Sequence, residues 1–270
     1  MKFFSVSSSN LIPADGQVWA VIPAAGSGSR MASAKPKQYL LLDGEPLLYR
    51  TLQRLSSHPA IVGIVVALGD DDRDFKALDI ATINAGLSYP LMTVVGGASR
   101  SESVAAALQA LSVEIAEQRA AVVAESANLT GSVHQSWVMV HDAARPCVRH
   151  EDIDQLLHQV DQQGGLLSLE VTDTLWQQDA DQRCDKTLPR EQLRRALTPQ
   201  LFPLQTLVDA LAQCHQQKFL PTDEAEAMVY VGFRPKLISG SADNIKVTRP
   251  GDMELASQYL RQQAADGVNG

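Results

Sequence analysis

Short, almost wholly apolar runs recur along the chain and alternate with amphipathic stretches. The apolar runs cover 18–23, 61–68, 91–95, 137–141 and 166–171, and stretches at helical spacing include 46–57, 101–118 and 151–162. Strands that are apolar throughout belong to sheets covered on both faces, and their alternation with helices is typical of parallel sheets. The pattern predicts an α/β fold: a Rossmann-like, mainly parallel twisted sheet with helices on both faces. Ligands bind such sheets beyond the carboxyl ends of the strands.

Two segments interrupt this alternation. Residues 119–136 are small, polar and patternless, which predicts a surface loop. Residues 172–197 hold a turn-like QQDADQRCD between two extended flanks, which predicts a protruding β-arm at about 172–192. Exposed arms often pair with a partner subunit, although the shape alone suits a mobile surface hairpin equally well. We expect a single domain over 18–265 and a disordered tail over 1–17.

Composition limits the kinds of partner. The 270 residues carry a formal net charge of −8, which argues against a broad basic face for nucleic acid. No apolar run approaches the roughly 20 residues that span a bilayer, so we expect no membrane partner. Cys147, Cys184 and Cys214 are far apart and have no metal-ligand spacing, which fits a reducing cytoplasm. An anion must therefore be bound locally, by Arg and Lys residues at particular places.

The segment AVIPAAGSGSRM, residues 20–31, ends an apolar run in small residues followed by cations. Glycines after a first strand turn backbone N–H groups toward an anion, and the next helix adds the positive end of its dipole. The Gly-Lys-Ser/Thr ending of a Walker loop is missing, and Met31 stands where a dinucleotide fingerprint requires Gly or Ala. The segment is suited to a polyphosphate, with a plain tight turn and solvated cations as the alternative.

Similar small-residue segments follow other runs. WVMVHDAARP places Asp142 at a strand end, where a carboxylate can accept from a ribose hydroxyl or meet Mg²⁺. VVGGASRSESV precedes a helix that we expect to begin near Ser101, capped by Ser101 or Ser103. SADNIKVTRPGD carries Lys246 and Arg249 ahead of a last helix. Each of these segments has a plain structural alternative, a cap or a solvated charge, but parallel strands bring their carboxyl ends to one edge of the sheet.

The motifs PAAGSGSRM, PKQY, HDAARP, ALTPQ, TDEA and DNIKVTRP resemble those of the 2-C-methyl-D-erythritol 4-phosphate cytidylyltransferase family, over about 18–262. The combination of HDAARP and DNIKVT is highly specific. The resemblance implies a homodimeric α/β enzyme with a β-arm that joins CTP to methylerythritol phosphate and releases pyrophosphate, in the non-mevalonate route to isoprenoid precursors.

The resemblance also implies particular site residues. Arg30, Lys37, Arg190 and Lys246 would be catalytic. The nucleotide loop would be formed by Ala24, Ala25, Gly26, Ser27 and Gly28, with Gly97 and Ser103 around the cytosine. Asp142 and Ala143 would meet the ribose, Asp142 being the candidate metal ligand, and Arg145 would join Lys246 on the incoming phosphate. Thr174 and Arg190 would reach the neighbouring subunit's substrate from the arm, and Thr222 matches a binding position. Ser29 and Ala98 depart from the family's pattern, where a basic and an acidic residue are common, so nucleotide contacts there are in question.

The chemistry implied is an attack by a phosphate oxygen on the α-phosphorus of CTP. The main obstacle is repulsion between two polyanions, so positioned cations and Mg²⁺ would dominate catalysis. A ribitol 5-phosphate cytidylyltransferase would use almost the same nucleotide loop, and a silent nucleotide-binding regulator is the alternative from another class. A nicotinamide-dependent dehydrogenase is disfavoured by Met31.

Overall fold

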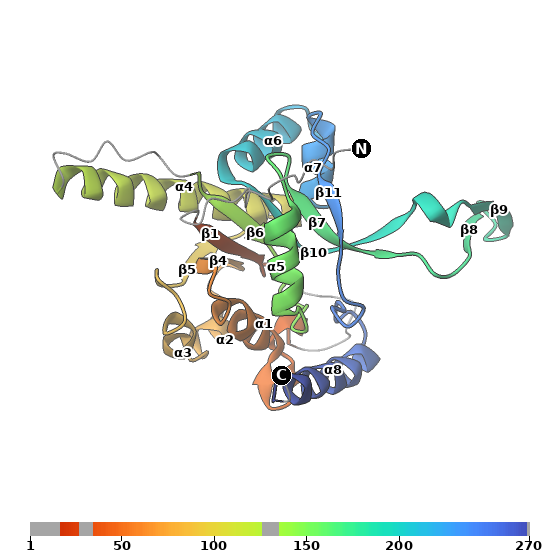
Figure 1. The fold of residues 1–270 in the computed structure, drawn as a ribbon, viewed down its shortest axis with the longest axis horizontal. Coiled ribbons are helices and arrows are strands. Elements are labelled where there is room, and N and C mark those ends of the chain that lie inside the picture. The colour runs from red at the N-terminus through yellow and green to blue at the C-terminus, as the bar shows by residue number, and fades with distance from the viewer. Residues whose placement is uncertain (1–16, 27–34, 126–134, 269–270) are drawn as a thin grey trace, which may run out of the picture.

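The computed structural model describes residues 17–26, 35–125 and 135–268. In these ranges a seven-stranded sheet forms the centre of the molecule (Figure 1). Its strands are, in spatial order, β11 (Lys236–Ser239), β7 (Gly165–Glu170), β10 (Arg194–Pro203), β6 (Trp137–Val140), β1 (Val18–Pro23), β4 (Ile61–Leu68) and β5 (Met92–Val95). Within the described sheet only β10 runs antiparallel to its neighbours, so the expectation of a mainly parallel sheet is confirmed.

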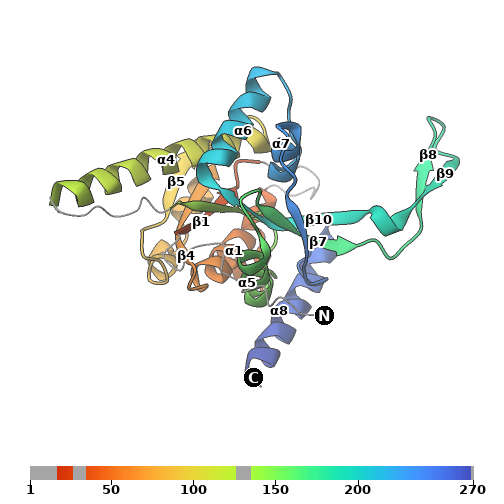
Figure 2. The same ribbon diagram turned by 45° about the horizontal axis from the view of Figure 1, so that its top comes forward.

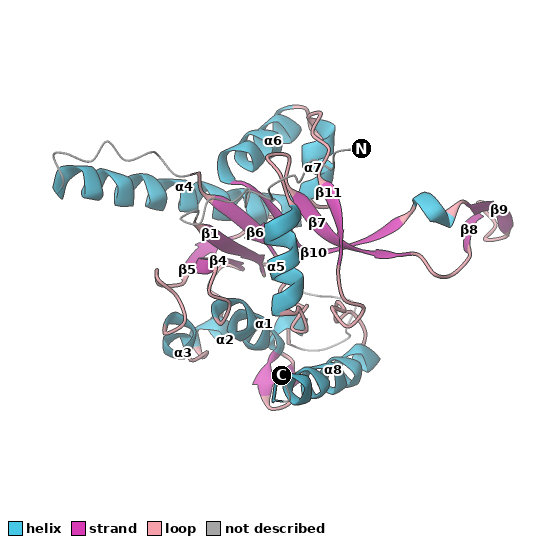
Figure 3. Cartoon of the chain, viewed as in Figure 1, coloured by secondary structure: helices cyan, strands magenta, loops and turns pink. Residues whose placement is uncertain are grey.

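Helices cover both faces of the sheet, as Figure 3 shows. One face packs against α1 (Leu47–Ser56), α3 (Ile80–Asn84) and α5 (His150–Gln159). The other packs against α4 (Arg100–Glu125), α6 (Leu204–Gln216) and α7 (Glu224–Tyr230). Strand β1 shows why its sequence is apolar throughout, because Val18, Ala20 and Ile22 enter the first core and Trp19 and Val21 the second.

Smaller elements complete the chain. They are the 3₁₀ turns η2 (Lys37–Tyr39) and η3 (Arg190–Gln192), the short strand pair β2 (Leu41–Leu42) and β3 (Glu45–Pro46), and the helices α2 (Arg73–Lys76) and α8 (Pro250–Val268). Helix α8 packs over Leu42 and Leu47 in a third, small core together with Ala144, Cys147 and Val247. This core lies directly beside the segment that follows β6.

The arm is a two-stranded hairpin of β8 (Leu175–Gln178) and β9 (Cys184–Leu188), followed by η3. It leaves the sheet between β7 and β10 and projects well clear of the body in both views (Figure 2). Trp176 is 57% exposed at its end. The β-arm expected at about 172–192 is therefore present.

Two expectations require correction. Residues 119–125 are not loop, because α4 continues to Glu125 and extends past the edge of the sheet (Figure 1); 126–134 lie outside the described residues. Helix α4 begins at Arg100, so the start expected near Ser101 is confirmed. Its cap is neither Ser101 nor Ser103 but Ser99: the Ser99 hydroxyl accepts from the Glu102 N–H (3.1 Å) and the Glu102 carboxylate accepts from the Ser99 N–H (3.0 Å).

The predicted N-terminal tail, 1–17, lies outside the described residues except for Gln17. The side chain of Gln17 donates to the Tyr89 hydroxyl (3.0 Å), and its carbonyl accepts from the N–H of Trp137 (2.9 Å). Gln17 is thus tied to the body of the domain where β1 begins. Among the helices in the described ranges, none has the length and apolar character needed to cross a bilayer.

Candidate active site

A cavity of about 290 Å³ lies beyond the carboxyl ends of β1, β5 and β6. Its lining comes from five separate segments, 23–26, 37–38, 97–103, 142–144 and 246–248. This is the edge where the sequence patterns predicted that the small-residue segments would meet. Four of the predicted segments therefore converge on one cavity.

Most of the predicted nucleotide and phosphate residues line this cavity. Those present in its wall are Ala24, Ala25, Gly26, Lys37, Gly97, Ser103, Asp142, Ala143 and Lys246. Three others, Ser27, Gly28 and Arg30, lie outside the described residues.

The remaining predicted residues lie elsewhere in this chain. Thr174 and Arg190 are on the arm, where the Arg190 guanidinium donates to the Thr172 carbonyl. Thr222 precedes α7, and its hydroxyl and N–H both donate to the Glu226 carboxylate (2.8 and 2.6 Å). None of the three is in the cavity wall of its own chain.

Asp142 is the centre of charge in the cavity. Its Oδ2 lies 3.0 Å from Lys246 Nζ and 3.1 Å from Arg145 Nε, and its Oδ1 lies 3.5 Å from Arg100 Nε. Lys246, Arg100 and Arg145 lower the pKa of this buried carboxyl well below its ordinary value, against the opposing effect of burial. Asp142 is therefore ionised, and it holds three cations close together at one side of the cavity.

Arg145 has a different place from the one expected. It is buried behind the cavity wall, and besides Asp142 it binds the Asn244 carbonyl through Nη1 (2.7 Å). Burial lowers its pKa while Asp142 raises it. The structure thus places Arg145 in the support of Asp142, whereas Lys246 is partly exposed and lines the cavity.

A closed network of hydrogen bonds fixes the segment that carries Asp142. The Thr198 hydroxyl accepts from the Asp142 N–H (3.0 Å) and donates to His141 Nδ1 (3.0 Å). The other ring nitrogen of His141, Nε2, then donates to the Arg145 carbonyl (2.9 Å). His141 is completely buried, and burial lowers its pKa to about 4, so the ring is neutral as this network requires. Asn244 closes the network, donating through Nδ2 to the Thr198 carbonyl (2.8 Å).

The opposite wall is built from backbone. Gln38 is buried and donates through Nε2 to the carbonyls of Ala24 (2.9 Å) and Gly26 (3.2 Å), which holds the segment after β1. A Cβ on Gly97 would lie 2.3 Å from Glu102 Cβ, so only glycine permits the first turn of α4 to approach this closely. Lys37 extends from η2 and donates to the Val247 carbonyl (3.2 Å), next to Lys246.

Sequence reasoning assigned no site role to several residues that shape the cavity, although it did count Arg100 among the cations within small-residue segments. Arg100, Ser99, Gln38 and Thr248 line the cavity, and Glu224 lies behind it. Arg100 follows a glycine pair, and Gln38, Thr198 and Glu224 belong to the PKQY, ALTPQ and TDEA motifs, so the sequence did carry a signal for them. Their partners are far along the chain, which no local pattern reveals.

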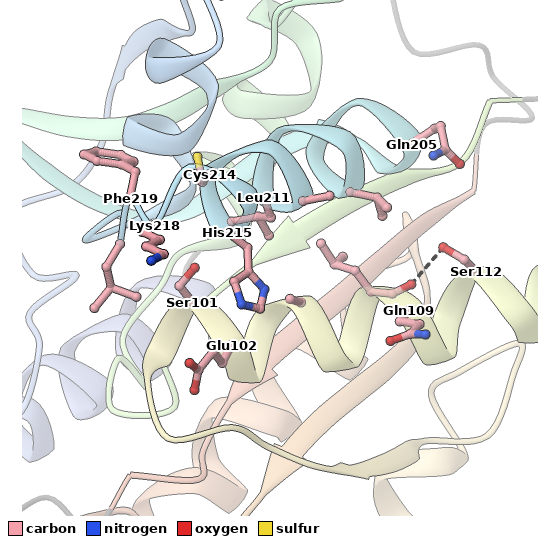
Figure 4. A pocket seen from close by; sticks show the side chains of 15 residues that line it. Ser101, Glu102, Gln109, Ser112, Gln205, Leu211, Cys214, His215, Lys218 and Phe219 are labelled. Carbon is pink, nitrogen blue, oxygen red and sulfur yellow. Dashed lines mark hydrogen bonds between the residues drawn. The ribbon is translucent and has the colours of Figure 1, made fainter.

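A larger hollow of about 660 Å³ lies between α4 and α6 (Figure 4). Its floor is mainly apolar, with His215 and Lys218 facing Ser101 across one end. None of the predicted site residues lines it. The chemistry therefore belongs to the smaller cavity around Asp142.

Comparison with known proteins agrees with this geometry. The sequence profile of the 2-C-methyl-D-erythritol 4-phosphate cytidylyltransferase family matches residues 18–262. The chain belongs to this family. Its relatives include the 2-C-methyl-D-erythritol 4-phosphate cytidylyltransferase of Haemophilus influenzae Rd, 46% identical over 241 residues, which are 89% of this chain and 95% of the relative. The enzyme of the same name from Vibrio vulnificus CMCP6 is 42% identical over 247 residues, 90% and 94% of the two chains.

Solved structures of the same cytidylyltransferase family superpose on this chain over most of its length. The crystal structure of 2-C-methyl-D-erythritol 4-phosphate cytidylyltransferase from Francisella tularensis superposes with a TM-score of 0.68 at 29% identity, covering 90% of this chain and all of the other. The enzyme of the same name from Thermus thermophilus gives a TM-score of 0.67 at 27% identity, covering 91% and 99% of the two chains. The expected fold class is confirmed by these neighbours.

Proposed function

We propose that the protein transfers the cytidylyl group of CTP to 2-C-methyl-D-erythritol 4-phosphate, giving 4-diphosphocytidyl-2-C-methyl-D-erythritol and pyrophosphate, a step of isoprenoid precursor biosynthesis. The observation that carries the proposal is the convergence of Lys37, Arg100 and Lys246 on one cavity of a chain with a net charge of −8. Membership of the family gives the two substrates. We infer a cytoplasmic location, the compartment of such metabolites.

The reaction joins two polyanions without a covalent enzyme intermediate. The phosphate oxygen of the alcohol substrate attacks the α-phosphorus of CTP, and the bond from that phosphorus to the pyrophosphate oxygen breaks. Positioned cations reduce the repulsion and stabilise charge as it develops on the leaving group. We assign Lys37 and Arg30 to the nucleotide's phosphates, and Lys246 to the attacking phosphate, because Lys246 lines the cavity beside Asp142.

Mg²⁺ would fit this site, where Asp142 would hold it together with phosphate oxygens of the substrate. Within the described residues no three His, Cys, Asp or Glu side chains gather so as to hold a metal, so an all-protein cage is not available. Asp142 is ionised; Arg100 Nε lies 3.5 Å from its Oδ1, whereas Lys246 Nζ and Arg145 Nε lie 3.0 and 3.1 Å from its Oδ2. Mg²⁺ binds proteins commonly through one or two carboxylates plus phosphate oxygens, and would supply charge neutralisation here.

We further propose that the arm joins two copies of the chain. An isolated two-stranded hairpin is marginally stable in water, and this one exposes Trp176 and Leu188. A second subunit would cover them, and would place Thr174 and Arg190 beside the cavity of the partner. Sedimentation of the intact chain should give a dimer, and Trp176→Ser should shift it toward monomer. A monomeric wild-type chain at micromolar concentration would contradict this part of the proposal.

One assay tests the reaction itself. Purified protein is incubated with CTP and Mg²⁺ and either methylerythritol phosphate or ribitol 5-phosphate, and ³¹P NMR follows the diphosphate product. We expect turnover with methylerythritol phosphate and little with ribitol 5-phosphate. Preference for ribitol 5-phosphate would assign a different cytidylyltransferase, and absence of turnover with both would leave a nucleotide-binding regulator. Lys246→Ala serves as the inactive control.

A further inference from the structure

Behind the cavity lies a buried carboxylate that the reaction outlined above does not use. Glu224, the first residue of α7, is 1% exposed. Its two oxygens bind the Arg100 guanidinium in a bidentate pair, Nη1 to Oε1 at 2.5 Å and Nη2 to Oε2 at 3.0 Å. Burial raises the pKa of Glu224 while Arg100 lowers it. Bidentate pairing of this kind fixes the plane of a guanidinium as well as its position.

The third nitrogen of the same guanidinium lies near Asp142. Nε of Arg100 lies 3.5 Å from Asp142 Oδ1, whereas Lys246 and Arg145 bind the other oxygen of that carboxylate. Arg100 is also the first residue of α4, directly after the turn that lines the cavity at 97–99. Glu224, Arg100 and Asp142 therefore form a line from α7, through the start of α4, to the end of β6.

The net charge around Asp142 depends on Glu224. Arg100, Arg145 and Lys246 surround one carboxylate, so the group carries two excess positive charges without Glu224 and one with it. With Glu224 absent, Asp142 would be the carboxylate within 4 Å left to Arg100 among the described residues. Arg100 would then compete more strongly for Oδ1, the oxygen that Lys246 and Arg145 leave to it in their shortest contacts.

We propose that Glu224 is a positioning residue: it holds Arg100 at a distance from Asp142, so that Asp142 keeps the orientation in which it binds CTP. The inference rests on the proposed function, because it assumes that Asp142 meets the nucleotide. A purely structural pair, which only joins α7 to α4, would have the same contacts. The positioning role and the purely structural role make different predictions. If Glu224 is a positioning residue, its effect on CTP binding requires the Asp142 carboxylate; if it is purely structural, the effect does not.

Equilibrium CTP binding, measured by titration calorimetry with Mg²⁺, separates them. Glu224→Gln keeps the shape of the side chain and removes its charge, and we expect about tenfold weaker CTP binding in the wild-type background. In an Asp142→Asn background, the same change should alter CTP affinity less than twofold. Equal losses in both backgrounds, or no loss in the wild type, would overturn the proposal. Asp161→Asn, which breaks the Lys236–Asp161 pair (3.1 Å) outside the cavity wall, is the matched control for loss of one carboxylate.

A second variant keeps the test valid if Glu224→Gln alone does not fold. Arg100→Gln combined with Glu224→Gln removes both charges and leaves no unpaired buried ion, which proteins tolerate better than loss of one partner. This double variant should fold and should bind CTP more tightly than Glu224→Gln alone, because no guanidinium at position 100 is left to compete for Asp142. A folded double variant that binds CTP as weakly as Glu224→Gln would refute competition by Arg100. If the wild-type chain itself does not bind CTP, the proposed function fails and this inference fails with it, whereas equal losses in a wild type that does bind CTP overturn this inference alone.

Discussion

Mild acid should weaken the segment that carries Asp142, because that segment depends on a neutral His141. The ring accepts from Thr198 at Nδ1 and donates to the Arg145 carbonyl at Nε2, so protonation would remove the acceptor. Burial lowers the pKa of His141 from 6.5 to about 4. Between pH 6.5 and pH 4 the His141 side chain binds a proton in the unfolded chain but not in the folded chain. The contribution of His141 to the free energy of unfolding therefore falls as the pH is lowered through this range, and it is constant above pH 6.5.

The size of this effect follows from the shift. One pKa unit corresponds to about 1.4 kcal/mol, so the full window contributes about 3 kcal/mol and the interval from pH 7 to pH 5 about 2 kcal/mol. Burial also lowers the pKa of His58, and Glu224 has a raised pKa whose contribution has the opposite sign. Both contributions are the same in the wild type and in a variant at position 141, so they cancel when the two proteins are compared.

The assay is urea unfolding of the wild type and of His141→Gln at pH 7 and pH 5. Gln does not titrate and can still donate to the Arg145 carbonyl. We expect the wild type to lose about 2 kcal/mol more than the variant between the two pH values. Parallel losses would show that His141 is not held neutral, and would refute the argument from the Thr198 network.

Three further changes have defined outcomes. Lys37→Ala should lower turnover on the order of a hundredfold, the usual effect of losing one electrostatic donor, with an unchanged melting temperature; Lys76→Ala, a paired surface lysine, is its control. Thr198→Val should cost roughly 1–3 kcal/mol of unfolding free energy in urea titration, because the Asp142 N–H and His141 Nδ1 lose their partner; Thr198→Ser should restore it. A thiol reagent at pH 8 should modify one cysteine quickly, since Cys184 is exposed whereas burial raises the pKa of Cys147 to about 12; Cys184→Ser should abolish the fast phase.

Much of the sheet could be predicted from periodicity, because its strands are buried on both faces and read as apolar runs. The runs at 18–23 and 61–68 match β1 and β4 in full. Strand β10 was not predicted as part of the sheet, since Pro199 and Pro203 interrupt its pattern and proline normally excludes a central strand. The structure accommodates Pro199 with an irregular register between Ala196 and Gln200, and Pro203 stands at the end of the strand. The surface loop predicted from 119 onward was wrong as far as Glu125, because small residues such as alanine suit a helix as well as a loop.

The site was predictable in location and only partly in detail. Strand-end residues such as Asp142 and Gly97 could be placed because parallel topology brings strand ends together. Arg145 shares the same motif, yet its side chain turns inward to Asn244, a contact that depends on tertiary packing. The pairing of Arg100 with Glu224 likewise joins two distant helices. The local sequence therefore shows which cations lie near the site, whereas the acceptor that each cation binds depends on the tertiary fold.

Strand β10 begins at Arg194, immediately after the arm, and reaches Thr198 beside Asp142 within its first half. Because this strand runs antiparallel to its neighbours, its start lies at the same edge of the sheet as their carboxyl ends, so the arm formed by β8 and β9 joins the body at the edge that carries Asp142. A second subunit that bound the arm would therefore contact the chain close in sequence to the Thr198 hydroxyl, which accepts from the Asp142 N–H.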